Sequence, residues 1–163
     1  MKPIIIRLLI PVIWLLVQLP QLHAQTATEF VRPPDVPPPP LNQKMLDFAH
    51  DNMGKQIGRG ICAEFVSAAV EHSTGVHYWR TGRRVDTRVE WIQPGDILYM
   101  SWKKGKRSHV AVILEVHAPH LVTVAHQNFN KIKHVVTTEY DLNQKIREGR
   151  IVKIYRPELT QEK

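Results

Sequence analysis

The chain has 163 residues, of which 23% are charged and 43% are hydrophobic, and this composition excludes an intrinsically disordered protein and a membrane protein with many spans. The formal net charge of +7 suits a polyanionic partner such as a bacterial envelope, and it also suits an ordinary soluble basic protein. The single cysteine excludes an intrachain disulfide framework and a cysteine-based zinc site.

The N-terminus has the layout of a secretory signal peptide. Lys2 and Arg7 precede an apolar run of about 12 residues, Leu8–Leu19, which is too short to span about 30 Å of hydrocarbon comfortably. The segment that follows ends in a small residue, Ala24. We therefore expect residues 1–24 to be cleaved off, leaving an exported periplasmic or secreted protein with no stable membrane insertion. An uncleaved membrane anchor is the alternative.

A proline-rich linker follows and precedes one domain. Residues 25–40 end in four consecutive prolines, which are extended and enter neither a helix nor a central strand. Residues 41–159 are enough for a single domain with one core and too few for two. Residues 160–163 form a short tail.

Apolar periodicity predicts two helices at the start of the domain. The first runs from Asn42, which caps it, to about Met53, with Gly54 as its end. The second runs over residues 61–73, with an apolar stripe at i, i+3, i+4, i+7 and i+8. This stripe begins at Cys62, so the cysteine lies in the first turn of the helix, on the face that packs inward.

From residue 97 onward the pattern is that of β-strands. A turn at residues 93–96 precedes them, and Lys103–Arg107 form a basic turn after the first strand. Because the helices come first and the strands afterwards, we expect an α+β domain with helices packed on a mainly antiparallel sheet. About five strands are predicted: 97–102, 108–117, 120–128, 135–140 and 151–155.

Two of the predicted strands bring polar residues together. A tight turn near Pro119 would pair residues whose numbers sum to about 236, so His109 would lie opposite the end of the next strand. Side chains alternate along a strand, so His126 and Asn128 would point to one face and Gln127 to the other. The spacing therefore predicts a His–His–Asn cluster at one edge of the sheet.

These residue types suit nucleophilic catalysis by Cys62. A helix N-terminus favours the thiolate, and a neighbouring imidazole of His109 would act as base and later protonate the leaving group. His126 would orient His109, and Asn128 would hold the same imidazole or polarise a carbonyl. A lone cysteine on an apolar helix face is more often a small buried hydrophobic residue, and that alternative stays open. An unpaired thiol in an exported protein risks oxidation, which favours a working role.

Five segments of the chain form an ordered set of motifs: Gly60–Val66, Gln93–Ile97, Ser108–Ile113, Val124–Asn130 and Val152–Pro157. In this order they resemble the papain-like bacterial wall hydrolases of the CHAP and NlpC-type families. The resemblance covers residues 41–158, and it implies a papain-like fold with Cys62 as nucleophile, His109 as base and Asn128 as an auxiliary residue. His126 stands where CHAP enzymes have Glu, whereas NlpC-type enzymes accept His as the third member. Gln56 has the spacing of papain's oxyanion glutamine, and an ordinary surface glutamine is the alternative.

The resemblance implies an exported cysteine peptidase or amidase. It would cleave amide bonds in peptidoglycan peptides through a Cys62 acyl-enzyme, with no cofactor and no metal. Its partners would be peptidoglycan or its stem peptides and an anionic envelope polymer, and the export signal argues against nucleic acid.

Three other functions stay open. The chain could be a catalytically inactive envelope-binding module of the same fold. It could also be a cysteine hydrolase or acyltransferase acting on a substrate other than peptidoglycan. A metal site built from the histidines is disfavoured because the sequence has no H-x-x-x-H or H-E-x-x-H helix.

Overall fold

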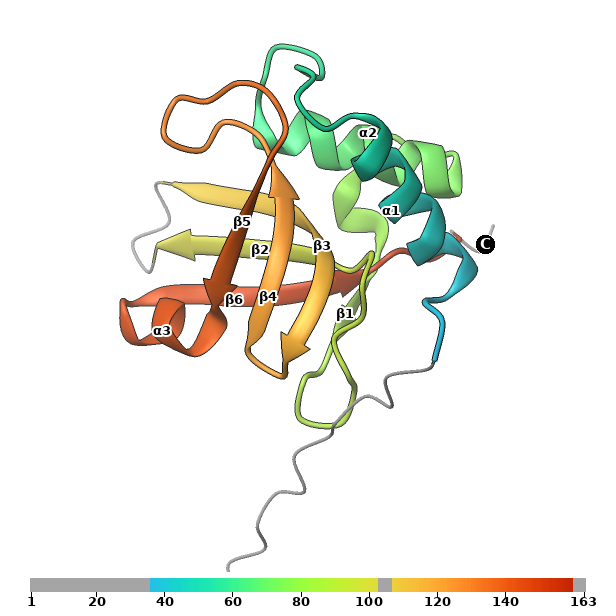
Figure 1. The fold of residues 1–163 in the computed structure, drawn as a ribbon. Coiled ribbons are helices and arrows are strands. Elements are labelled where there is room, and N and C mark those ends of the chain that lie inside the picture. Colours follow the sequence, from blue (N-terminus) through green and yellow to red (C-terminus); the bar gives the residue numbers. More distant parts are fainter. Residues whose placement is uncertain (1–35, 103–106, 160–163) are drawn as a thin grey trace, which may run out of the picture.

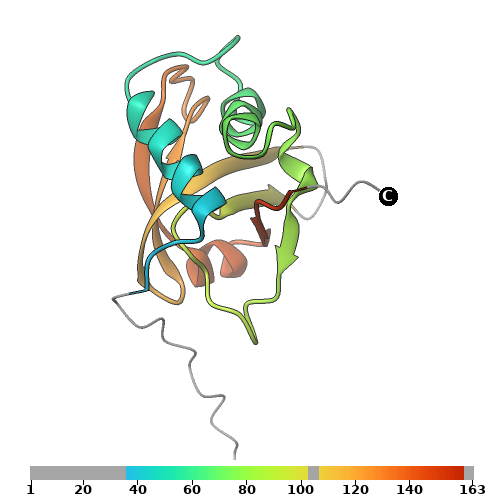
Figure 2. The same cartoon turned by 90° about the vertical axis from the view of Figure 1, so that its right-hand side faces the viewer.

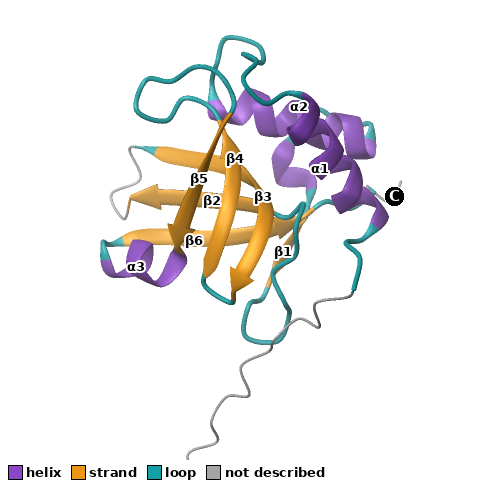
Figure 3. Cartoon of the chain, in the orientation of Figure 1, coloured by secondary structure: helices purple, strands orange, loops and turns teal. Residues whose placement is uncertain are grey.

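The computed structural model describes residues 36–102 and 107–159. The expected signal peptide, most of the linker, residues 103–106 of the basic turn and the tail lie outside the described residues. Within them the chain folds as an α+β domain, with three α-helices packed on one antiparallel sheet of six strands, which confirms the predicted class (Figures 1 and 3). None of the described helices combines the length and apolar character needed to cross a membrane.

Every neighbouring pair of strands in the sheet is antiparallel. The strand order is β1-β6-β2-β3-β4-β5, so the last strand of the chain lies between the first two. The sheet therefore brings the C-terminal segment into the centre of the domain. The strands are β1 Arg83–Val85, β2 Ile97–Trp102, β3 Ser108–Ala118, β4 Leu121–His126, β5 Val136–Asp141 and β6 Arg150–Arg156.

Two helices lie side by side against one face of the sheet. They are α1, Pro40–Asp51, and α2, Cys62–Thr74, and both views of the fold show them together (Figures 1 and 2). A 3-10 turn, Trp79–Thr81, follows α2, and the short helix α3, Leu142–Arg147, connects β5 to β6. The face covered by α1 and α2 is called the helix face below.

Each face of the sheet carries its own apolar cluster. Along β3, Val110 and Val112 pack with α1 and α2 on the helix face. Ala111 and Ile113 belong to a second cluster on the opposite face, with residues from β2, β4 and β6. Because side chains alternate along a strand, membership of one cluster or the other fixes the direction of each side chain.

The first helix differs from the prediction at its start. It begins at Pro40, where proline is favoured because the first helical N–H has no partner, so Asn42 is not the cap. Asn42 is instead fully buried, and its amide donates hydrogen bonds to the Pro94 carbonyl at 2.9 Å and to Asp96 Oδ1 at 2.8 Å. The prediction was wrong because the side chain serves a tertiary contact.

Two short elements, β1 and α3, were not predicted from the sequence. β1 has three residues, too few to show alternation, and it forms by pairing with β6. α3 has six residues, and Asp141 caps it by accepting a hydrogen bond from the Gln144 N–H at 3.0 Å. Neither element has the length on which periodicity depends.

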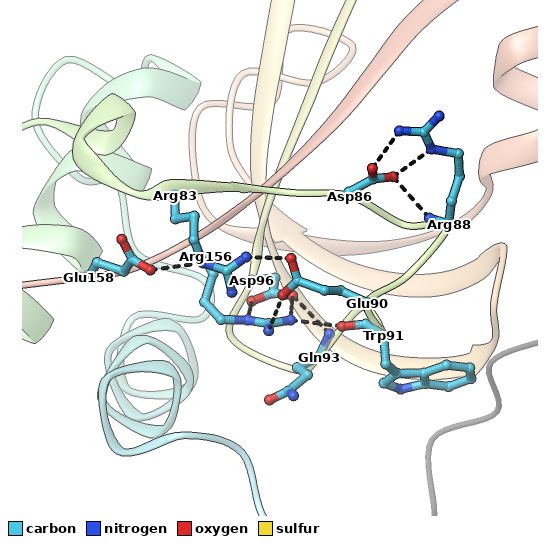
Figure 4. Close-up of polar contacts among 9 residues, drawn as sticks. All are labelled: Arg83, Asp86, Arg88, Glu90, Trp91, Gln93, Asp96, Arg156 and Glu158. Carbon is cyan, nitrogen blue, oxygen red and sulfur yellow. Dashed lines mark hydrogen bonds and ion pairs between the residues drawn. The ribbon is translucent and has the colours of Figure 1, made fainter.

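A buried ion pair ties the turn before β2 to the end of β6. Arg156 binds both carboxylate oxygens of Asp96, with Nε–Oδ1 at 2.9 Å and Nη2–Oδ2 at 2.8 Å (Figure 4). The Gln93 N–H donates to Oδ2 of the same carboxylate at 2.9 Å. Asp96 is fully buried, so Arg156 is its necessary counter-charge.

Candidate functional site

Two histidines are in contact where β3 begins and β4 ends. His109 Nε2 lies 2.6 Å from His126 Nδ1, and His126 Nε2 lies 2.9 Å from Oγ1 of Thr138 on β5. The two rings meet edge to face, with their centroids 4.9 Å apart. His126 is fully buried, so its two ring nitrogens are both used inside the protein.

The pairing of β3 with β4 explains this contact. Val112 lies opposite Ala125 and Ile113 opposite Val124, which is one residue from the register expected from the turn near Pro119. Two irregularities between Ile113 and the turn absorb the difference.

Burial keeps both imidazoles neutral at pH 7. It lowers the pKa of His109 to about 4, and burial followed by the charge of His109 lowers the pKa of His126 to about 3. The hydrogen bonds that join His109, His126 and Thr138 in series allow two arrangements of their protons. In one of them His109 donates from Nε2 to His126, His126 donates to Thr138, and Nδ1 of His109 keeps a free lone pair. This arrangement makes His109 a base.

His109 lines a pocket of about 750 Å³. The pocket lies against the opposite face from α1 and α2, because the residue across from His109 on β2, Met100, belongs to the cluster on that face. Its described lining is aromatic and basic: Met100, Trp102, Arg107, Ser108, His109, Asn128, Phe129, Asn130, Tyr140, Lys145 and Arg150.

Asn128 lies in this pocket, but it does not continue β4. The strand ends at His126, and Asn128 has a φ of 60°, in the left-handed region that asparagine tolerates. Its backbone N–H donates to the Ile132 carbonyl at 2.6 Å, and its side chain is exposed. The expected alternation therefore stops two residues early, while Asn128 still borders the same pocket as His109.

Gln127 points to the helix face, as the alternation predicts. Its side chain is fully buried and makes three hydrogen bonds. It accepts from the Ile57 N–H at 3.1 Å, and it donates to the carbonyls of Ile57 and Ile61, each at 2.8 Å. Gln127 thus ties the end of β4 to the segment that immediately precedes Cys62.

Cys62 is the first residue of α2 and is 8% exposed, so it lies in the first turn and packs inward as predicted. It belongs to the helix-face cluster, together with Val110 and Ala125. His109 points to the other face of the sheet, because it neighbours Val110 along β3. In the described part of the chain, no hydrogen bond joins the thiol to His109 or His126, and Cys62 does not line the pocket. The structure thus brings His109, His126 and Asn128 together, but not Cys62.

Gln56, the oxyanion candidate, is exposed. Its amide donates to the carbonyl of Gly58 at 3.1 Å, within its own turn. It is not among the described residues that line the pocket.

Three further residues contribute to this site and were not predicted from the sequence. Thr138 holds the far ring nitrogen of His126, Tyr140 packs edge to face against the same ring with centroids 6.0 Å apart, and Arg150 borders the pocket from β6. All three come from strands distant in sequence from β3. Only a prediction of the strand order would have found them.

Among residues 36–102 and 107–159, no three or more His, Cys, Asp or Glu side chains are grouped so that they could hold a metal ion.

No protein-family model matches the sequence, and no curated protein is similar enough to count as a relative. Among the solved structures with a similar fold are two crystal structures of Ly7917. One, Ly7917 with the hydrolyzing product of MDP, aligns with a TM-score of 0.56 at 14% identity, and the other, Ly7917, with a TM-score of 0.54 at 16% identity. Each alignment covers 71% of this chain and 62% of the other chain. At these identities the likeness establishes a shared fold.

Proposed function

We propose that the chain is a peptidoglycan hydrolase, and that it is an exported cysteine peptidase or amidase of the CHAP/NlpC type. Two independent features support the substrate. The fold resembles that of Ly7917, whose crystal structure holds the hydrolysis product of MDP, a peptidoglycan fragment. Five segments of the sequence resemble segments of the CHAP and NlpC-type families in order, and they follow a segment with the layout of an export signal.

The observation that carries the proposal is the contact between His109 and His126. Because His126 occupies Nε2 of His109, Nδ1 is the nitrogen left to accept a proton. Burial keeps His109 neutral, so it acts as a general base on a thiol and not as half of a preformed ion pair. His126 fixes the ring orientation and Thr138 fixes His126, which is the arrangement of an oriented catalytic histidine.

In the proposed reaction Cys62 gives its thiol proton to His109 Nδ1, and the sulfur attacks the carbonyl carbon of a peptide amide. The C–N bond then breaks as His109 protonates the leaving amine, which gives a thioester on Cys62. Water hydrolyses the thioester, releasing a carboxylic acid and restoring the thiol. Asn128, at the edge of the same pocket, would hold the imidazole or the carbonyl, and Gln56 remains the candidate for the oxyanion.

This reaction requires the thiol to reach His109. Cys62 packs on the helix face in the structure, so the first turn of α2 has to move toward the edge of the sheet before attack. The Gln127 side chain holds the segment before this turn to β4, directly beside His126, so the movement has to break its hydrogen bond to the Ile61 carbonyl.

The buried position of Cys62 favours a second candidate function. With the thiol away from the pocket, the same domain would bind peptidoglycan without cleaving it, as an envelope-binding module. The two functions differ in the reactivity of Cys62. Alkylation of Cys62 by iodoacetamide that is faster in the wild type than in His109→Ala supports the enzyme, because His109 then acts as a base on the thiol, whereas equal rates in the two proteins support the binding module.

The decisive experiment is incubation of the protein with purified peptidoglycan, followed by mass spectrometry of the released fragments. We expect fragments from the wild type and none from Cys62→Ala or His109→Ala. His117→Ala is the matched control, because His117 is an exposed histidine on the same strand as His109, and it should release the same fragments as the wild type. Co-sedimentation with peptidoglycan in the absence of any released fragment would establish the binding module instead.

A further inference from the structure

We infer that the pocket beside His109 contains a subsite for a carboxylate group, formed by Arg150 and Tyr140. The inference deepens the proposed function and rests on it for the identity of the ligand, since it names the part of a peptidoglycan peptide that the pocket recognises. Unsatisfied polar atoms and cationic side chains of residues that line the pocket indicate the subsite itself.

Arg150 is held in place by stacking. It lies opposite Trp102 in the pairing of β2 with β6, and its Cζ is 3.4 Å from the centroid of a Trp102 ring. A guanidinium stacked through its face keeps its N–H donors at the edge, where they are free to bind a planar anion. Nη1 of Arg150 is buried and has no hydrogen-bond partner among the described residues.

Tyr140 supplies a second unsatisfied donor to the same pocket. Its side chain is 5% exposed, and its hydroxyl is buried without a hydrogen-bond partner in the described part of the chain. Burial raises the pKa of Tyr140 to about 12, so the hydroxyl keeps its proton and can donate. Buried polar groups in proteins are almost always paired, and two unpaired donors in one pocket indicate that a ligand provides the acceptors.

The charge of the pocket selects an anion. Three cationic side chains line it, those of Arg107, Lys145 and Arg150, and its described lining contains no carboxylate. Lys145 is partly neutralised by Glu148, 3.2 Å away, and its Nζ lies 5.7 Å from the centroid of the Tyr140 ring. Arg150 has no such acidic partner among the described residues, so it is the cation that a ligand would neutralise.

A carboxylate matches these features best. It is planar, carries one negative charge and has two oxygens, one for the arginine edge and one for the tyrosine hydroxyl. Peptidoglycan stem peptides carry free carboxylates close to their amide bonds. A carboxylate held by Arg150 would therefore position a neighbouring amide beside His109, which lines the same pocket.

The test is a binding measurement that does not depend on turnover. We would titrate the Cys62→Ala protein by calorimetry with MDP and with MDP whose carboxylate is converted to a primary amide. The expected result is that MDP binds at least about tenfold more tightly than its amide. Equal affinity for the two compounds, or no measurable binding of MDP, would overturn the subsite.

Variants assign the preference to the two residues. Arg150→Gln should abolish the preference for the carboxylate, Arg150→Lys should retain part of it because the charge stays while the planar edge is lost, and Tyr140→Phe should reduce it severalfold. Arg147→Gln is the matched control, because Arg147 is an exposed arginine on α3 outside the described pocket lining. A preference that survives in both Arg150→Gln and Tyr140→Phe would refute the assignment, and thermal melting of each variant identifies loss of the fold.

Two further comparisons separate the outcomes. If inorganic phosphate displaces MDP as well as acetate does, the pocket is a general anion site and the assignment to a carboxylate is wrong. Peptidoglycan cleavage is measured separately, so its absence alongside a clear carboxylate preference would refute the hydrolase and leave the subsite standing. Cleavage without any carboxylate preference would refute the subsite and leave the proposed hydrolase standing.

Discussion

His126 and Gln127 are adjacent in the chain but bind to opposite sides of the sheet. His126 contacts His109 and Thr138 on the face that carries the pocket, while Gln127 hydrogen-bonds to Ile57 and Ile61 on the helix face. Two consecutive residues at the end of β4 thus connect the histidine pair to the segment before α2. The relative position of the candidate base and the helix start is set at this point.

The three hydrogen bonds of Gln127 predict a large loss of stability when its side chain is removed. Gln127→Ala leaves the carbonyls of Ile57 and Ile61 without their donor and creates a cavity, so the free energy of unfolding should fall by about 3 kcal/mol. Urea denaturation measures the change. Gln144→Ala, an exposed glutamine on α3, should change it by less than about 0.5 kcal/mol, and an equally small effect of Gln127→Ala would contradict the argument.

Much of the histidine site could be predicted from local sequence. The turn near Pro119 and the two-residue period of strands fix the pairing of β3 with β4, so the approach of His109 to His126 follows from their spacing. The apolar stripe of α2 likewise predicts that Cys62 lies in its first turn.

The position of Cys62 relative to His109 could not be predicted in the same way. Residues 110–114 of β3 are buried on both faces of the sheet, so their sequence is continuously apolar and does not indicate which face the helices cover. Thr138 and Arg150 lie at the site only because strands distant in sequence pair with one another. Asn42 does not cap the first helix as expected, because its side chain binds Asp96.

The histidine pair predicts a loss of stability in mild acid. The folded pKa values of His109 and His126 are about 4 and about 3, below the value of about 6.5 for an unfolded histidine. Between pH 6.5 and 4 the unfolded chain binds protons that the folded chain does not, so the free energy of unfolding falls as the pH falls. The slope is at most about 1.4 kcal/mol per pH unit for each histidine.

Denaturation by urea at pH 7, 6 and 5 measures this slope. His126→Gln removes one of the two groups and should reduce the slope, whatever it does to stability at pH 7. His117→Gln replaces an exposed histidine and should leave the slope unchanged. Equal slopes in the wild type and in His126→Gln would show that His126 titrates normally in the folded protein.

The buried ion pair of Asp96 and Arg156 predicts that the free energy of unfolding depends strongly on the presence of both charges. Asp96→Asn removes the bidentate partner of the Arg156 guanidinium and leaves it with the weaker contact to Glu90 at 3.5 Å as its counter-charge, so it should lower the free energy of unfolding by about 3–5 kcal/mol. Asp86→Asn is the control, because Asp86 pairs with Arg88 at the surface and its loss should matter much less (Figure 4). Similar losses in the two variants, compared by urea denaturation, would mean that burial adds nothing to the Asp96 pair.

The export proposal predicts the N-terminus of the mature protein. The intact mass of protein recovered from outside the cytoplasm should correspond to a chain that begins near Gln25. Ala24→Lys should block cleavage, because the cleavage site requires a small residue. A wild-type mass that still includes residues 1–24 would favour the membrane anchor.

His126 provides the sharpest test of the proposed mechanism. His126→Ala removes the group that orients His109, so it should lower kcat by about a hundredfold or less, whereas Cys62→Ala should abolish turnover.

His126→Glu places a carboxylate beside His109, as in the CHAP pattern, and should keep activity. That carboxylate stabilises the imidazolium and raises the pKa of His109, so the acid limb of the kcat/KM profile should move to higher pH. Rates of fragment release between pH 4 and 8 measure both effects. If His126→Ala is fully active and His126→Glu is inactive, His126 is a packing residue, and Asn128, which borders the same pocket, becomes the first candidate for the third member.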